Sequence, residues 1–261
     1  MLKINKLSIE VDGKKILNDI SLSFDLGKTY FLLGKNWSWK SSLAMSIAWH
    51  PKYKISNWNI FLDDKDIIAM TPDERSRLWI FLSFQNIPEI PWIRLSEFLR
   101  TIYNQNQKSK NPDSKDITPF MFSRILKKYL DDIWLPESFA SRDLNVWFSW
   151  WEKRKIELLQ IKLLEPKFII LDEIDSWLDI DAFKVVASSL ANLKNPENTL
   201  IFITHNFNLM DFIDVDRAFV MDKWNLIDSW DKSLIEKIKK HWYCDYCKDV
   251  WPECNLVTKC A

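Results

Sequence analysis

Glycine is almost missing from this chain of 261 residues, which contains 3 glycines and 15 tryptophans. An ordinary chain of this length has roughly 7% glycine, or about 18 residues, which equals the number of glycines and tryptophans taken together. A compact fold with many connections needs residues that accept positive φ angles and close backbone approach, and glycine does so without steric cost. Many tryptophans therefore stand where a fold would require glycine.

The contexts of the tryptophans support this interpretation. Trp58 in SNWNIF, Trp224 in DKWNLI and Trp230 in DSWDKS have polar neighbours and interrupt the apolar periods instead of completing them. Asn-Gly and Ser-Gly are turn dipeptides, whereas Asn-Trp is not. The alternative is a tryptophan-rich protein that buries its indoles in the core. We favour the hypothesis that the codon UGA was translated as tryptophan although the source organism reads it as glycine.

Charge and hydropathy exclude several classes of protein. The 36 basic and 36 acidic residues balance, which argues against a nucleic-acid surface as the main purpose of the chain. There is no run of 18 apolar residues, so we expect no membrane span. The first residues alternate in polarity instead of forming an apolar signal core, and we therefore expect a cytoplasmic protein.

The order of the apolar patterns predicts an α/β fold. The patterns indicate, in chain order, strands at 2–11, 16–24 and 29–34, a helix at 40–49, short strands between 58 and 90, mostly helix from 95 to 165, a strand at 168–173, a helix at 181–193 and a strand at 199–205. The last strand–helix–strand unit implies a parallel sheet.

A phosphate-binding loop is predicted between the strand at 29–34 and the following helix. Its residues are Gly34, Lys35, Asn36, Trp37, Ser38, Trp39, Lys40, Ser41 and Ser42, which fit G-x-x-x-x-G-K-[ST] everywhere except at Trp39. In such a loop the backbone N–H groups point at the phosphates, so the indoles of Trp37 and Trp39 would fill the phosphate volume. We expect Lys40 on the β- and γ-phosphates and Ser41 on Mg²⁺.

A second motif is the apolar strand Phe168–Leu171 followed by two carboxylates. Asp172 is expected to reach the metal shell, and Glu173 to orient and deprotonate an attacking water. By itself the same pattern is also typical of a core strand with a solvated acidic end. The phosphate loop upstream favours the catalytic interpretation.

The third motif runs Phe148-Ser149-Trp150-Trp151-Glu152-Lys153-Arg154 and precedes the amphipathic stretch IELLQIKLL. With glycine at 150 and 151, it resembles the LSGGQ signature of the ATP-binding-cassette superfamily. The resemblance implies that Ser149, Trp150, Trp151 and Glu152 act in trans, on the γ-phosphate held by a second copy of the chain.

Further motifs of this superfamily follow in the expected order. Gln85 resembles the Q-loop glutamine that contacts Mg²⁺ and the water, Ser176–Asp179 resembles the D-loop, and His205 resembles the histidine at the γ-phosphate. The resemblance implies an ATP hydrolase that uses ATP and Mg²⁺ and pairs with a second copy in an ATP sandwich. The implied fold is an α/β P-loop ATPase with a RecA-like core, an antiparallel β subdomain and an α-helical subdomain at about 86–165, all within residues 1–243.

Within the superfamily, the surroundings of the motifs resemble the ATPases of the sulfur-mobilisation (Suf) system for iron–sulfur cluster assembly. The resemblance lies in AWHPKYKIS at 48–56, FLSFQNIPEIPWI at 81–93 and LDEIDSWLDIDAFKVVA at 171–187. Tryptophan occupies a family glycine at Trp37, Trp39, Trp49, Trp58, Trp92, Trp147, Trp150, Trp151, Trp177 and Trp230. The resemblance implies scaffold partners of the SufB and SufD type and no nucleic acid. The segment Ile87–Arg94 is the expected partner face, and the alternative is an ordinary solvated loop.

The tail at 244–261 falls outside the resemblance. Its cysteines, Cys244, Cys247, Cys254 and Cys260, supply enough thiolates for a tetrahedral Zn²⁺ site. Their spacing is loose, so an unstructured reduced tail and a bound cluster stay open as alternatives. Two other functions also stay open: the ATPase subunit of a membrane importer, and a catalytically dead nucleotide-binding module if the tryptophans are the encoded residues.

Overall fold

The structure is a computed structural model that describes residues 1–261 except 35–37, 58, 175–179, 206, 223–224 and 232–261. The elements are β1 (Leu2–Val11), β2 (Lys14–Phe24), β3 (Thr29–Gly34), α1 (Lys40–Ile47), β4 (Lys54–Asn57), β5 (Ile60–Leu62), β6 (Lys65–Asp66), α2 (Pro72–Arg77), β7 (Ile80–Ser83), β8 (Ile90–Arg94), α3 (Leu95–Lys110), α4 (Pro119–Asp132), the 3₁₀ helix η1 (Glu137–Ser141), β9 (Asp143–Leu144), α5 (Trp150–Leu164), β10 (Phe168–Asp172), α6 (Ile180–Ala191), β11 (Thr199–Ile203), η2 (Phe207–Asp211), β12 (Arg217–Asp222) and β13 (Asn225–Asp231).

A mostly parallel sheet lies at the centre of the described residues, in the order β13-β12-β3-β11-β10-β7. Only β13 is antiparallel to its neighbour among these described strands. Strands β3, β10 and β11 are buried along their whole length, which is typical of a parallel sheet covered on both faces. The expected strand–helix–strand unit is present as β10, α6 and β11, so the predicted α/β class is confirmed.

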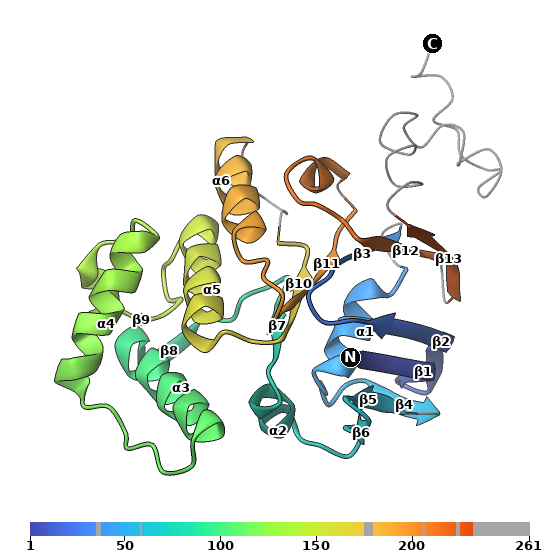
Figure 1. The fold of residues 1–261 in the computed structure, drawn as a ribbon, viewed down its shortest axis with the longest axis horizontal. Coiled ribbons are helices and arrows are strands. Elements are labelled where there is room, and N and C mark those ends of the chain that lie inside the picture. Colours follow the sequence, from blue (N-terminus) through green and yellow to red (C-terminus); the bar gives the residue numbers. More distant parts are fainter. Residues whose placement is uncertain (35–37, 58, 175–179, 206, 223–224, 232–261) are drawn as a thin grey trace.

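The second sheet is antiparallel and has the order β2-β1-β5-β6, with β4 also paired to β1. Leu2, Ile4, Leu7 and Ile9 of β1 are all buried, and a register shift between Ile4 and Leu7 keeps the later pair on the core side. These residues share one apolar cluster with Leu43 of α1. The antiparallel sheet therefore packs against the helix that follows the phosphate loop (Figure 1).

Helices α3 and α4, η1 and one face of α5 form a separate helical part with its own apolar cluster, which includes Leu99, Leu126 and Ile156 (Figure 1). Leu158 and Ile161 of α5 belong instead to the cluster beside the parallel sheet. Helix α5 therefore connects the helical part to the sheet.

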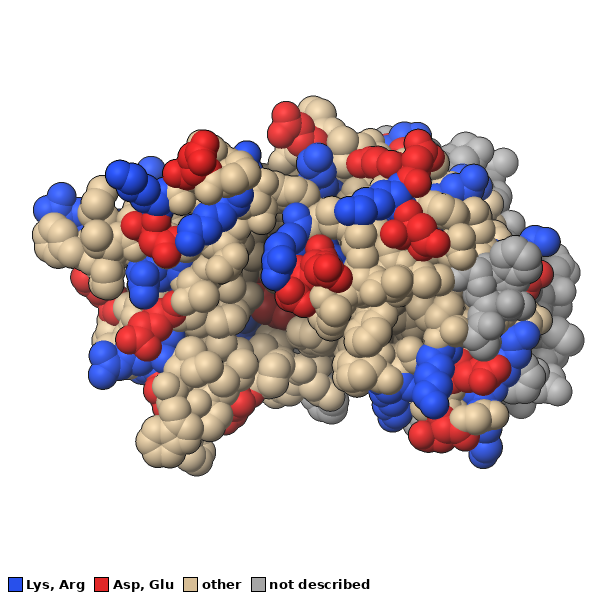
Figure 2. Space-filling view, turned by 90° about the horizontal axis from the view of Figure 1, so that it is seen from below, with Lys and Arg blue, Asp and Glu red and all other residues tan. Residues whose placement is uncertain are grey.

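Charged side chains of both signs are interspersed over the face seen in Figure 2, as the balanced composition leads one to expect. Among the helices that the structure describes, none combines the length and the apolar character needed to cross a membrane.

Candidate nucleotide site

The phosphate loop begins where β3 ends. At Gly34 a Cβ atom would clash with the Met221 carbonyl and lie 2.7 Å from Ser38 Oγ, so the close backbone approach requires glycine. Lys40 starts α1 and is buried, and its Nζ donates to the Gly34 carbonyl at 2.9 Å and to Ser38 Oγ at 3.0 Å. Three predicted residues of the loop, Lys35, Asn36 and Trp37, lie outside the described residues. Ser38 and Ser42, two positions before and after Lys40, are buried as Lys40 is.

Trp39 is the residue before α1 and has a left-handed backbone, with φ at +61°. Its side chain packs, partly buried, against the apolar cluster that contains Leu43. A left-handed tryptophan at this position is unusual, because side chains other than those of glycine, asparagine and aspartate rarely adopt that conformation.

Ser41 and Asp172 form the candidate metal site. Ser41 Oγ donates to Asp172 Oδ1 at 3.0 Å, and Asp172 is fully buried at the end of β10. Burial raises the pKa of Asp172 to about 6, although the Ser41 hydroxyl lowers it. The other oxygen, Asp172 Oδ2, is buried without a hydrogen bond among the described residues. A hydroxyl beside a carboxylate with an unpaired oxygen fits a hard cation such as Mg²⁺.

The side chains of Gln85, Glu173 and His205 converge beside this pair. Gln85 Nε2 donates to Glu173 Oε2 at 2.6 Å, and His205 Nδ1 lies 3.6 Å from Glu173 Oε1. Glu173 follows β10 with a left-handed backbone, and its N–H donates to the Ile203 carbonyl at 2.8 Å. The structure thus brings together five groups that were predicted from four separate motifs, namely Ser41, Gln85, Asp172, Glu173 and His205. They meet at the carboxyl ends of the parallel strands, where ligands bind in open α/β sheets.

The signature residues lie at the start of α5. Ser149 is the N-cap: its Oγ accepts from the Glu152 N–H at 3.3 Å, and its N–H donates to Glu152 Oε2 at 2.7 Å. Trp150 is exposed and Trp151 is partly buried. Ser149 and Glu152 therefore satisfy each other in a capping box, and neither takes part in the contacts around Asp172 and Glu173 described above.

Sequence reasoning gave no role to a buried network behind Glu173. Arg154 and Glu157, both on α5, form an ion pair of 2.7 Å that also contacts Ser83 at the end of β7. The available signal was the presence of an arginine and a glutamate three residues apart on a helix whose other residues are largely apolar, since such charges are rarely buried unless paired.

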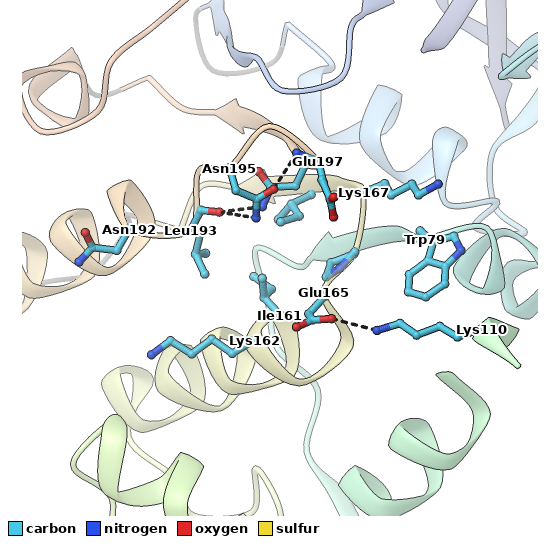
Figure 3. Close-up of a pocket in the computed structure, with 13 residues that line it drawn as sticks. Trp79, Lys110, Ile161, Lys162, Glu165, Lys167, Asn192, Leu193, Asn195 and Glu197 are labelled. Atoms are coloured by element: carbon cyan, nitrogen blue, oxygen red, sulfur yellow. Dashed lines mark hydrogen bonds and ion pairs between the residues drawn. The ribbon is translucent and has the colours of Figure 1, made fainter. Parts of the chain in front are cut away.

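A pocket lies at the amino ends of the parallel strands, on the side opposite the candidate nucleotide site (Figure 3). It has a volume of about 520 Å³ and is lined by Trp79, Lys110, Glu165 and Lys167, among others, with Lys110 paired to Glu165 at 2.9 Å. Trp79, Lys167 and Asn198 precede β7, β10 and β11, so this pocket faces the amino ends of the strands. None of the predicted site residues that the structure describes lines it.

Comparison with known proteins decides the family. The sequence model of the ABC transporter family matches residues 17–176. The chain belongs to the ABC transporter family. A probable ATP-dependent transporter, ycf16, of Antithamnion sp. is 40% identical to this ABC protein over 94% of the chain and 97% of the relative. The iron–sulfur cluster assembly protein SufC of Plasmodium falciparum is 35% identical over 95% of the chain and 72% of the relative.

Solved structures of ABC cassettes share the fold. A dimeric post-hydrolysis state of the ATP-binding cassette MJ0796 bound to ADP and Pi has a TM-score of 0.72 at 16% identity and covers 89% of this chain and 99% of that one. At this identity the likeness shows the fold alone. Together with the family match it confirms the predicted ABC-type fold, and the protein is an ATP-hydrolysing enzyme.

Proposed function

We propose that this ABC ATPase hydrolyses ATP to drive iron–sulfur cluster assembly on a scaffold of the SufB/SufD type. The observation that carries the proposal is the similarity to the Plasmodium SufC over nearly the whole chain, together with the Suf-like segments at 48–56, 81–93 and 171–187. The second candidate is the ATPase subunit of a membrane importer, which is favoured by the name of the Antithamnion relative, a probable ATP-dependent transporter.

In the proposed reaction Lys40 and the loop backbone hold the phosphates, while Ser41, Asp172 and Gln85 serve Mg²⁺. The cation would neutralise charge that develops on the phosphates. Glu173 acts as the general base for the attacking water, since its carboxylate accepts from Gln85 and lies beside His205, the proposed γ-phosphate contact.

The proposed site is completed by a second copy of the chain. Ser149 and the first N–H groups of α5 would face the γ-phosphate held by the partner copy, because a helix N-terminus favours anions. Support comes from the position of Ser149 as the N-cap of α5 and from the dimeric state of the MJ0796 cassette.

The proposed scaffold contact is Ile87–Arg94. Ile93 is 41% exposed, so the segment presents an apolar side chain to solvent. The segment is connected to the start of α5 and to the turn before it, because Asn145 Nδ2 donates to the Pro88 carbonyl at 3.0 Å and the Lys153 side chain pairs with that of Glu89 at 2.8 Å. A scaffold bound here would therefore act on the start of α5.

We also propose that the tryptophans are glycines in the native protein. Among the described residues, tryptophans at left-handed φ angles are Trp39, Trp49, Trp79, Trp92, Trp134 and Trp147. Trp49, Trp79 and Trp134 each follow the C-cap of a helix, the position where a left-handed glycine most often ends a helix. A left-handed backbone costs a bulky residue about 1–2 kcal/mol, and glycine avoids this cost.

The mass of the intact protein from its native host tests the glycine proposal. We expect a mass well below 31.2 kDa, because each indole side chain would be absent. A native mass that matches the written sequence would overturn it, and the catalytically dead module would then become the leading alternative.

We propose that the cassette spans residues 1–243 and that its helical subdomain lies at about 86–165. We also propose a cytoplasmic location for the protein. The cysteines Cys244, Cys247, Cys254 and Cys260 lie outside the described residues, as does Ser176–Asp179, so the Zn²⁺ site stays a prediction that zinc analysis of the purified protein would test.

The functional proposal is tested with the glycine form, meaning the full chain with glycine at its 15 tryptophan positions. We expect slow ATP hydrolysis alone and faster hydrolysis with the SufB/SufD-type proteins of the same organism. Ile93→Asp should weaken binding to these proteins by about 10-fold or more, since it places a charge in an apolar contact. Phe120→Asp, at an exposed apolar residue of α4, is the matched control. Copurification with an integral membrane protein, without binding to the scaffold, would favour the importer.

A further inference from the structure

Arg154 occupies an unusual position for a charged residue. It lies on α5 with only 1% of its surface exposed. Its Nη1 donates to Ser83 Oγ at 3.1 Å, to the Phe84 carbonyl at 3.0 Å and to Glu157 Oε2 at 2.7 Å. Its Nη2 donates to the Gln85 carbonyl at 3.3 Å and to the Glu173 carbonyl at 3.4 Å. One guanidinium thus contacts both residues whose side chains form the Gln85–Glu173 hydrogen bond.

The charge of Arg154 is balanced inside the protein. Glu157 is buried one turn further along α5, where its carboxylate also accepts from Ser83 Oγ at 2.8 Å and from the Phe84 N–H at 3.3 Å. Burial raises the pKa of Glu157, and the neighbouring Arg154 opposes that rise. A buried ion pair loses much of its attraction to desolvation, so stability alone is a weak reason for it.

Geometry gives a stronger reason for the pair. Its acceptors come from the end of β7, from the segment that carries Gln85 and from the residue that follows β10. A planar guanidinium with fixed donor directions holds several such acceptors at once, whereas a lysine ammonium supplies only one nitrogen. The side chains of Gln85 and Glu173 are hydrogen-bonded to each other, and Arg154 Nη2 donates to the backbone carbonyls of both. The relative position of Gln85 and Glu173 therefore depends on the Arg154 side chain.

We propose that Arg154 is a positioning residue for ATP hydrolysis, which fixes Gln85 and Glu173 relative to each other and couples both to the start of α5. This inference rests on the roles proposed above for Gln85 and Glu173. Arg154 has no proposed contact with the nucleotide and acts through the backbone carbonyls of Gln85 and Glu173. Because Arg154 is in the second turn of the helix that Ser149 caps, a displacement of α5 would move both residues with it.

The test compares Arg154→Lys with Arg124→Lys in the full-length glycine form. Arg124 is an exposed arginine of α4 stacked over the Phe120 ring, so its substitution controls for the chemical change itself. For Arg154→Lys we expect kcat to fall about 10-fold or more, since small misplacement of catalytic groups is costly, with the Kd for ATP within about two-fold. The Mg²⁺ concentration that gives half-maximal rate should rise, because Gln85 is a proposed Mg²⁺ contact. Arg124→Lys should change none of these values.

Two controls separate this inference from its alternatives. Circular dichroism and thermal unfolding establish that Arg154→Lys is folded, and a kcat within about two-fold of the parent would then overturn the positioning role. A loss of rate in proportion to a loss of ATP binding would also overturn it, since that is the result of a purely structural defect. Glu173→Gln is measured in parallel: if that variant hydrolyses ATP normally, the proposed site itself fails, whereas its inactivity with a normal Arg154→Lys rejects only the role of Arg154.

Discussion

The carboxyl ends of the parallel strands, here called the edge, differ from the exposed rim of the helical part in which partners their side chains contact. At the edge, Ser41 donates to Asp172, and Gln85 donates to Glu173. At the rim, which comprises β8 and the turn 145–150, Ser149 bonds within its own helix cap, and the side chains of Trp92 and Trp147 are 91% and 87% exposed. The edge therefore has its geometry set within one chain, whereas the rim leaves side chains exposed to solvent.

Because of this difference, we expect substitutions in the two regions to have different effects. Substitutions at the edge should change the chemistry or the electrostatics of an isolated chain. Substitutions at the rim should act through a partner or through the local backbone, because the exposed side chains there have little packing to lose. Arg154 lies between the two regions, on α5, and contacts both Gln85 and Glu173 of the edge.

The largest effect is expected at the edge, from Glu173→Gln in the glycine form. Loss of the general base should lower turnover by about 10²–10⁴-fold. ATP binding should persist, because the substitution keeps the size of the side chain and leaves Lys40 and the phosphate loop intact. Single-turnover hydrolysis and equilibrium ATP binding measure the two effects. Turnover equal to the parent would refute the role of Glu173 and with it the catalytic role of the edge.

Asp172→Asn should produce the next largest effect, on stability. Burial raises the pKa of Asp172 to about 6 from an ordinary value of 3.8, so without Mg²⁺ the folded state holds its proton more tightly than the unfolded state. Ionisation therefore destabilises the fold as pH rises from about 4 to about 6, by roughly 3 kcal/mol at most. In EDTA at pH 7.5 the variant should have the higher Tm, and its advantage should shrink at pH 5.

Mg²⁺ and ATP should reverse that order, because the cation stabilises only the carboxylate form and the variant lacks it. Differential scanning calorimetry at the two pH values, with and without Mg·ATP, measures both effects. A Tm difference that is the same at pH 5 and pH 7.5 would show that the buried charge of Asp172 is not its source.

The sequence predicted the edge better than the rim. Motif spacing identified Ser41, Asp172 and Glu173 because buried parallel strands have continuous apolar runs, and their carboxyl ends meet at one edge. The side-chain hydrogen bond between Gln85 and Glu173 joins residues 88 positions apart, and no local pattern encodes it. The spacing of Arg154 and Glu157 on α5 indicates an ion pair, but its contacts with Ser83, Phe84 and the residues Gln85 and Glu173 are also remote in sequence.

Local patterns also failed for two strands late in the chain. Strands β12 and β13 were not predicted, and the two residues between them, 223 and 224, lie outside the described residues. Glycine and asparagine are the usual sequence signals of a short connection between antiparallel strands. Tryptophan at positions where glycine would mark a turn weakens the local signals from which strand ends are predicted. The apolar strands still specify the order of the sheet.

A smaller effect, at the rim, is expected from Ser149→Ala. Loss of the cap should cost about 1 kcal/mol in stability and lower turnover by about 10-fold, since a charge-stabilising donor to the γ-phosphate is lost. Monomer binding of ATP should not change. Mixing this variant with Glu173→Gln sharpens the test, because a hybrid dimer has one site with both native groups. Recovered activity in the mixture, measured against each variant alone, is expected, and its absence would contradict action in trans.

The smallest effect is expected at Trp92 of the written sequence. Trp92 has φ at +69° on the exposed strand β8, and its N–H donates to Asp143 Oδ2 at 2.9 Å. Because its indole is almost fully exposed, removing it loses little packing, and the backbone strain dominates. Trp92→Gly should therefore stabilise the fold by about 1 kcal/mol, after the greater entropy of glycine in the unfolded chain offsets part of the gain.

Trp92→Ala is the matched control for that prediction, because it removes the indole but keeps the Cβ that strains a left-handed backbone. Urea unfolding of the three proteins should rank Trp92→Gly as the most stable, with Trp92→Ala close to the parent. If alanine stabilises as much as glycine does, the exposed indole is the unfavourable feature and the left-handed backbone has no share in it. If neither substitution stabilises, tryptophan is tolerated at this position of β8, and the structural support for native glycine at the rim falls away while the edge is unaffected.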